Sequence, residues 1–207
     1  MCVHIRGMRI LSRISVFAMT LALAACGGAQ PEDQAAIAAC KSRSSAAVGG
    51  PFQLTAHNGA PTTEANFKGR KALVFFGYTY CPDICPVVLF NVGKALEDVP
   101  EAKRPVTLFI SVDPARDTPE TLTQYIASNG FPKDIVGLTG TLDELKAVNA
   151  AFKTPGFGRD ETTDASGGYL VSHSSWLYLM NENWTMDTFF NDTASPAEIA
   201  RCINLLS

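Results

Sequence analysis

Residues 72–96 read ALVFFGYTYCPDICPVVLFNVGKAL, and this stretch decides the fold that the sequence predicts. It begins with a continuous apolar run, Ala72 to Phe76, which has the length of a strand and suits a central strand covered on both faces. The loop after it contains two cysteines, each followed by proline. Because proline suits the first turn of a helix, Pro86 predicts a helix through Val87 to Leu96.

The two cysteines of this loop, Cys81 and Cys85, are the first candidate functional residues. Proline disfavours the helical region for the residue before it, so both are predicted to be non-helical, with Cys85 at the helix N-cap. The positive end of the helix dipole favours thiolate over thiol at that position. Such a pair closes a disulfide or clamps a soft metal. A structural disulfide is the alternative. Closing so short a loop removes little entropy from the unfolded chain, so we favour a functional role.

The spacing of the pair distinguishes it from other cysteine motifs. A thioredoxin-type redox motif has two residues between its cysteines, whereas three lie between Cys81 and Cys85. Haem attachment requires a histidine where Pro86 stands. A zinc site normally offers four protein ligands, or three and an open position. A peroxidatic cysteine needs an activating threonine and arginine, and Thr79 supports that function only weakly.

Strand and helix signals alternate along the rest of the chain. Thr118-Pro119-Glu120 combines a capping hydroxyl with proline at the first helical position, and Thr141 and Ser195 each begin a capping box. The expected elements are a small strand at 52–54, a strand at 106–112, helices after Thr118, Thr141 and Ser195, and a hairpin of 175–180 and 184–190. This order predicts an α/β sandwich with a mixed central sheet flanked by helices, consistent with a thioredoxin-like order.

His173 is the histidine that the sequence places near the chemistry. It follows Ser172 and directly precedes an apolar strand. A hydrogen-bonded loop histidine is one interpretation, and we favour a third metal ligand that folds over Cys81 and Cys85. Two thiolates and one imidazole suit Cu(I), and the same groups with a fourth, weaker donor suit Cu(II). His57, in contrast, is expected to be a surface residue of a turn.

The composition indicates a folded, mildly acidic protein. The chain has 207 residues, of which 46% are hydrophobic and 18% charged. This length allows one domain with a full hydrophobic core, and the hydrophobic content excludes a disordered chain. The net charge of −3 excludes a generic basic nucleic-acid binder, so no nucleic-acid partner is expected.

The N-terminus resembles a bacterial lipoprotein signal. A segment with three arginines precedes an apolar, charge-free run at 14–25, which is too short to span a bilayer comfortably. Small residues then lead to Cys26, so we expect cleavage before Cys26 and its lipidation. An ordinary signal peptide cut nearby and a buried first helix are the alternatives, and Met8 competes with Met1 as the start.

Three segments follow from this interpretation: a signal peptide at 1–25, a lipid-anchored tether at 26–49 with a short helix near 32–41, and a domain at 50–207. The expected location is the periplasmic side of a bacterial cytoplasmic membrane. Thiols oxidise there unless they are kept reduced or metal-bound. An even pair, Cys40 and Cys202, therefore predicts a disulfide between the tether and the last helix. A buried free thiol at Cys202 is the alternative.

Four segments of the chain resemble one known family. They are GYTYCPDICP at 77–86, SVDPARDTPE at 111–120, LTGT at 138–141 and the strand near His173. Over about 50–206 the chain resembles the Sco family of copper proteins for cytochrome c oxidase assembly, also called SenC-like. The resemblance implies a thioredoxin-like fold and copper bound by Cys81, Cys85 and His173. It also implies delivery of copper to the CuA centre of oxidase subunit II, or reduction of that subunit's cysteines.

One position departs from the family's pattern. The family often has an aspartate just before the metal-binding histidine, whereas this chain has Ser172, which forms hydrogen bonds but brings no charge. Partners of a ligand imidazole tune its basicity, so we expect the copper affinity or the Cu(I)/Cu(II) balance to differ. Asp113 either approaches the site as a partner of the ligands or turns its loop with Pro114. Arg116 and Asp117 are expected to pair locally or to meet a partner protein.

Three functions remain open on the sequence, and they leave enzymatic activity undecided. The first is a copper metallochaperone. The second is a thiol-disulfide reductase that uses Cys81 and Cys85 as a redox pair and attacks its target through a mixed disulfide. The third is a copper or redox sensor, or a peroxide-linked thiol protein. The expected partners are oxidase subunit II, the membrane through Cys26, and another copper chaperone or a thioredoxin-like reductant.

Overall fold

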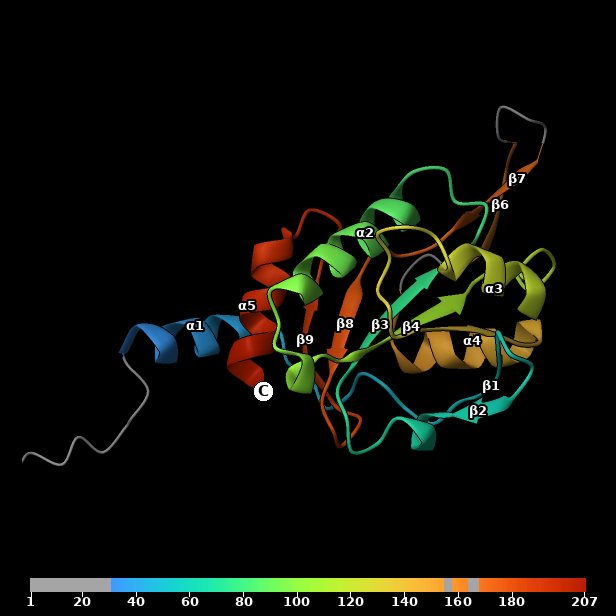
Figure 1. Cartoon of the computed structure of the whole chain (residues 1–207). Coiled ribbons are helices and arrows are strands. Elements are labelled where there is room, and N and C mark those ends of the chain that lie inside the picture. The colour runs from blue at the N-terminus through green and yellow to red at the C-terminus, as the bar shows by residue number, and fades with distance from the viewer. Residues whose placement is uncertain (1–30, 155–157, 164–167) are drawn as a thin grey trace, which may run out of the picture.

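The computed structural model describes residues 31–154, 158–163 and 168–207. The predicted signal peptide at 1–25 and the predicted lipidation site Cys26 lie outside the described residues. In chain order the elements are α1 (Pro31–Lys41), β1 (Gln53–Ala56), β2 (Pro61–Thr63), η1 (Glu64–Asn66), β3 (Ala72–Gly77), α2 (Ile84–Glu97), η2 (Glu101–Lys103), β4 (Val106–Ser111), α3 (Pro119–Ile126), β5 (Ile135–Thr139), α4 (Leu142–Ala151), β6 (Gly158–Thr163), β7 (Tyr169–Ser172), β8 (Leu177–Met180), β9 (Met186–Phe190) and α5 (Pro196–Leu206) (Figure 1).

A seven-stranded mixed sheet forms the centre of the domain, in the order β2-β1-β5-β4-β3-β8-β9. Strands β3, β4 and β5 run parallel to one another, and β8 pairs antiparallel with β3. Every residue of β3 and β4 is buried, which is why both strands read as continuous apolar runs. The predicted mixed central sheet flanked by helices is therefore confirmed.

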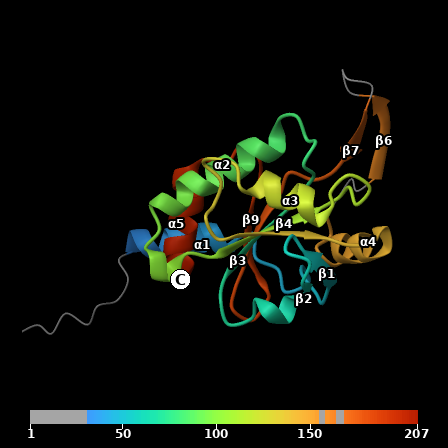
Figure 2. The same ribbon diagram turned by 45° about the vertical axis from the view of Figure 1, so that its right-hand side comes forward.

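Alternate side chains of β3 point to opposite faces of the sheet and build two cores. Leu73 and Phe75 pack with side chains from α1, α2, α3 and α5. Val74 and Phe76 pack with side chains from α4 and β1. Figures 1 and 2 show α2 and α3 on one side of the sheet and α4 on the other. Because both faces are covered, the loops at the carboxyl ends of the parallel strands are the natural place for a site.

The helix after β3 begins earlier than the sequence predicted. It starts at Ile84 with Asp83 as its N-cap residue, so Cys85 lies in the first helical turn. The first four N–H groups of a helix have no partner within the helix, and Pro86 at the third position therefore removes no helical hydrogen bond. The prediction that Cys85 is non-helical was wrong, because the bias that a proline puts on the preceding residue is only a preference, whereas Cys81 lies in the loop before the helix.

Four strands were not predicted, namely β2, β5, β6 and β7. Strand β5 was missed because Gly137 interrupts a short apolar run. A Cβ atom at Gly137 would lie 3.1 Å from the Cβ of Leu122 in α3, so the glycine allows the helix to pack closely on the strand. Strand β2 has three residues, and β6 has a polar sequence, so neither shows a strand pattern.

Residues 31–49, which the sequence assigned to the tether, pack against the domain. A disulfide joins Cys40 in α1 to Cys202 in α5, with an S–S distance of 2.02 Å. Farther along, Ser45 forms an antiparallel bridge with Met186 of β9. The part of the predicted tether that the structure describes is thus held to the fold. Within the described ranges, no helix has the length and apolar character needed to cross a bilayer.

Candidate metal centre

Three segments meet at one edge of the sheet. Strands β3 and β4 are parallel neighbours, so the loops that follow them, with Cys81 and Asp113, leave the sheet at the same edge. Strand β8 runs antiparallel to β3, with Leu177 opposite Phe75, so the segment before β8 arrives at that edge too. This segment carries His173. The order and direction of the strands therefore bring His173 to the cysteines.

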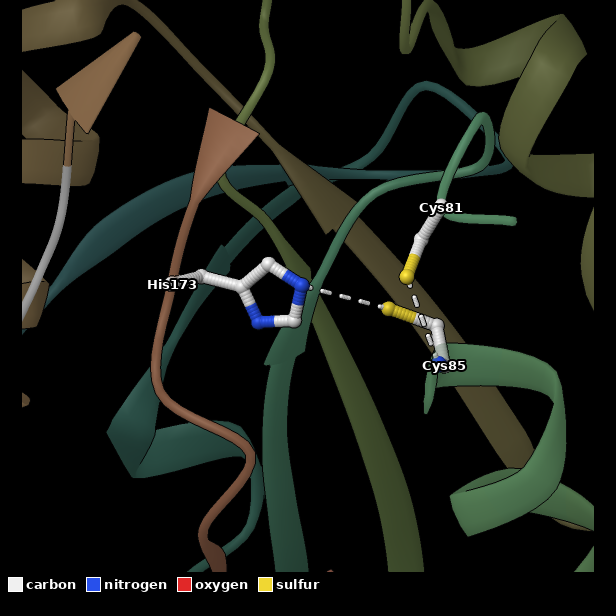
Figure 3. A group of neighbouring side chains, drawn as sticks. All are labelled: Cys81, Cys85 and His173. Atoms are coloured by element: carbon white, nitrogen blue, oxygen red, sulfur yellow. Dashed lines mark hydrogen bonds between the residues drawn. The ribbon is translucent and has the colours of Figure 1, made fainter. Parts of the chain in front are cut away.

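Cys81, Cys85 and His173 form a compact group of donor atoms (Figure 3). The two sulfurs and the imidazole nitrogen lie within 4.8 Å of one another. The Nε2 atom of His173 is 3.6 Å from the Sγ atom of Cys85, and the backbone N–H of Cys85 donates to the Sγ atom of Cys81 at 3.4 Å. Both cysteines are free thiols. Two sulfurs and one imidazole nitrogen at this separation suit a soft metal ion, and copper fits this donor set.

The imidazole of His173 is oriented by its other nitrogen. Its Nδ1 atom is 3.0 Å from the carbonyl oxygen of Ser174, which accepts hydrogen bonds and cannot donate them. In the neutral imidazole, Nδ1 therefore carries the proton, which leaves the lone pair on Nε2, the nitrogen that faces the Cys85 sulfur. The ring of Tyr78 contacts the imidazole edge-on, with centroids 5.5 Å apart. His173 thus has the tautomer and direction of a metal ligand.

The two thiols differ in burial and acidity. Cys85 is fully buried, whereas Cys81 is partly exposed. Hydrogen bonding from Cys85 lowers the pKa of Cys81 to about 4. Desolvation opposes this shift, and a hydrogen bond with His173 adds to it. Burial, followed by the hydrogen bond to Cys81, raises the pKa of Cys85 well above its ordinary value. The accessible sulfur of this coupled pair is therefore the one that loses its proton first.

A buried carboxylate holds the cysteine loop in place. Asp117 is fully buried and accepts hydrogen bonds from the hydroxyl groups of Thr79 and Ser111, each at 2.6 Å. Burial raises the pKa of Asp117. This contact was not predicted from the sequence, although the polar residues at the ends of two apolar strands were a signal for it. Because the Thr79 hydroxyl is bonded to Asp117, it is not directed at Cys81 as peroxidatic activity would require.

The other residues singled out in the sequence lie around the donor group. Asp113 is next to the site but outside the group; its carboxylate accepts from the hydroxyl of Tyr169 at 2.7 Å and from the Nε atom of Arg116. Ser172 is exposed. His57 lies in a turn, where its Nδ1 atom accepts a backbone N–H of β5 at 3.3 Å. The structure thus brings together three predicted ligands and keeps His57 apart from them.

Comparison with known proteins adds a family assignment. The family model described as SCO1/SenC matches residues 40–206. Protein SenC of Rhodobacter capsulatus is 33% identical over 203 residues, which cover 93% of this chain and 90% of SenC. The mitochondrial protein SCO2 of Saccharomyces cerevisiae is 41% identical over 139 residues, which cover 66% of this chain and 45% of SCO2. The chain spans about half the length of the mitochondrial relatives first matched.

The solved structures support the same assignment. Bradyrhizobium japonicum ScoI with copper bound superposes with a TM-score of 0.66 at 36% identity, covering 76% of this chain and 98% of that chain. The predicted thioredoxin-like α/β fold is therefore confirmed by the sheet and by its structural neighbours. With a family model that matches most of the described domain and a relative that aligns over nearly its whole length, the chain belongs to the SCO1/SenC family.

Proposed function

We propose that this protein is a membrane-tethered copper chaperone that binds one copper ion through Cys81, Cys85 and His173. It delivers the ion to the CuA centre of cytochrome c oxidase subunit II. The observation that carries the proposal is the convergence of two sulfurs and one correctly oriented imidazole nitrogen within 4.8 Å. Copper in the related ScoI structure and the role of the Sco family in cytochrome c oxidase assembly support it.

The difference between the two cysteines suits transfer as well as binding. Cys81 is partly exposed and has a pKa of about 4, so at neutral pH its thiolate is accessible to a partner. Copper with two thiolates and one imidazole has room for a further sulfur. Incoming cysteine thiolates of the acceptor replace the protein ligands one at a time, and the buried Cys85 is the last ligand to be released. The copper is cargo in this scheme, and no electron transfer is needed.

A thiol-disulfide reductase is the second candidate, because the same pair has the asymmetry of a nucleophile and a resolving thiol. The Cys81 thiolate would attack a target disulfide, forming a mixed disulfide and releasing one target thiolate. The Cys85 sulfur would then attack Cys81, releasing the second target thiolate and leaving a Cys81–Cys85 disulfide. The target is reduced by two electrons, and a thioredoxin-like dithiol must reduce this protein again.

The test is anaerobic titration of the reduced, full-length chain in detergent with Cu(I) and, separately, Cu(II). One tightly bound copper per chain, lost in Cys81→Ala and in Cys85→Ala, is expected. His173→Ala should strongly weaken Cu(II) binding and leave the dithiol of Cys81 and Cys85 reactive. His57→Ala is the matched control, because His57 lies in a turn apart from the donor group. A folded protein with two titratable thiols and no copper uptake would favour the reductase.

The proposed location is the periplasmic side of the cytoplasmic membrane, with the chain anchored through lipid on Cys26. The motif around Cys26 supports this, and α1 begins at Pro31, shortly after it. Cys26→Ser should therefore move the protein from the membrane fraction to the soluble fraction without changing copper stoichiometry. If the variant stays in the membrane fraction as the parent does, another segment anchors the chain.

A further inference from the structure

The segment that carries His173 lies beyond the main sheet. Strand β7 pairs with β6 in a separate two-stranded sheet, and both views show this hairpin extending away from the body of the domain (Figures 1 and 2). On the other side of His173, the chain joins the main sheet at Leu177. Main-sheet pairing therefore restrains His173 from its C-terminal side, and contacts of β7 must restrain it from the N-terminal side.

Side chains at alternate positions of β7 make these contacts. Tyr169, Val171 and, just past the strand, His173 follow the two-residue alternation and share one face. Val171 is buried in the core, and its backbone hydrogen-bonds to the phenol oxygen of Tyr78. The hydroxyl of Tyr169 donates to the carboxylate of Asp113 at 2.7 Å. Contacts at two positions fix both the place and the direction of the strand that leads into His173.

Arg116 connects this strand to the cysteine loop. The centre of its guanidinium lies 3.8 Å from the ring centroid of Tyr169 and 4.8 Å from that of Tyr80, the residue before Cys81. Its Nε atom donates to Asp113, and the two side chains are 18% and 4% exposed, respectively. A planar guanidinium stacks on aromatic rings while it forms directional hydrogen bonds, which an ammonium group does not do. Arg116 is thus shared between the two halves of the candidate site.

Asp113 can hold Tyr169 and Arg116 in place because hydrogen bonds within its own loop fix its position. Its backbone N–H donates to the Oγ atom of Ser111 at 3.0 Å, and its carbonyl oxygen accepts the backbone N–H groups of Arg116 and Asp117. Ser111 also donates to Asp117, which in turn holds Thr79 of the cysteine loop. The loop after β4 is therefore bonded both to the cysteine loop and, through Asp113, to the strand before His173.

We propose that Tyr169, Asp113 and Arg116 form a clasp that positions His173 over the cysteine pair. The three are positioning residues, and none of them is a ligand. This inference rests on the proposed copper site. Two thiolates suffice for Cu(I), whereas Cu(II) depends on the nitrogen donor. Loosening the clasp at Tyr169, whose strand leads into His173, therefore weakens Cu(II) binding and spares both Cu(I) binding and dithiol reactivity.

Tyr169→Phe is the sharpest test, since it removes one hydroxyl group and keeps the ring under Arg116. We expect Cu(II) affinity to fall about tenfold, with a changed thiolate-to-Cu(II) charge-transfer band, while Cu(I) affinity is unchanged. Arg116→Lys keeps the charge but loses the stacking, so it should also weaken Cu(II) binding; because Arg116 contacts Tyr80 beside Cys81 as well, the selectivity for Cu(II) is tested by Tyr169→Phe. Tyr178→Phe is the matched control, because the Tyr178 hydroxyl is bonded to Thr154 at 3.5 Å, away from the clasp. It should bind both copper ions as the parent does.

A metal-free measurement separates the clasp from the copper site. In the full-length reduced protein without copper, amide hydrogen exchange over 170–174 should be about tenfold faster in Tyr169→Phe than in the parent or in Tyr178→Phe. Unchanged exchange there, or equal losses of Cu(I) and Cu(II) affinity, would overturn the clasp. If the parent chain binds no copper, the proposed function fails, and the exchange rates alone decide the clasp.

Discussion

Removing the disulfide between Cys40 and Cys202 should lower the free energy of unfolding by about 5 kcal/mol. The perturbation is the double variant Cys40→Ala/Cys202→Ala. Both cysteines are buried, at 4% and 3% exposure, where α1 packs on α5. The bond lies outside the donor group of the metal centre, so the copper stoichiometry should stay the same.

The magnitude follows from the length of chain that the bond closes. The two cysteines are 162 residues apart in sequence, so the closed loop contains nearly the whole domain. The loop-closure relation gives the unfolded chain an entropy penalty worth about 5 kcal/mol at room temperature for a loop of this length. Folded domains of this size have unfolding free energies of roughly 5–15 kcal/mol, so the loss is a large part of the total. The bond therefore holds α1, the segment nearest the proposed anchor, on the domain.

The assay is urea unfolding followed by circular dichroism, in a parent that also carries Cys81→Ala and Cys85→Ala. Cys81 and Cys85 are absent from that background, so the effect of a reductant on stability reports on the Cys40–Cys202 bond. Reducing the parent should lower the free energy of unfolding by about as much as the double alanine substitution does. Reducing the double variant should leave its free energy of unfolding unchanged. A loss below about 1 kcal/mol would refute the loop-closure argument. Alkylation of Cys40 and Cys202 in the denatured, unreduced parent would refute the bond itself.

Three further predictions concern the site and its scaffold. Because the pKa of Cys81 is lowered to about 4, its thiolate persists down to that pH, and its alkylation rate should be nearly flat from about pH 6 to 8; a rate that rises tenfold per pH unit would contradict this. Gly77→Ala places a Cβ atom 2.7 Å from the Sγ atom of Cys85, so it should weaken Cu(I) binding in titrations and cost about 1–3 kcal/mol in urea unfolding. Thr141→Ala removes the capping acceptor of the Glu144 N–H and should cost about 1 kcal/mol, with copper binding unchanged; a change in copper binding would show that α4 is coupled to the site.

Much of the central fold could be predicted because its signals are local. The continuous apolar runs at Ala72 to Phe76 and from Val106 onward indicate buried strands, and both lie at the centre of the sheet. Hydroxyl caps at Thr118 and Thr141 mark helix starts that the structure reproduces. Local rules failed where neighbouring structure overrode them. Pro86 is tolerated inside the first turn of α2, and Gly137 breaks a strand pattern so that α3 can pack against β5.

The sequence by itself determined the chemistry available at the site: two cysteines at a fixed spacing after a buried strand, and one histidine before another. Only the tertiary structure decided that these groups meet, because the antiparallel pairing of β8 with β3 brings His173 to the edge where Cys81 and Cys85 lie. The contact of Tyr169 with Asp113 likewise could not be predicted from the chain order. Strand order and direction come from long-range packing, and no local pattern of residues encodes them.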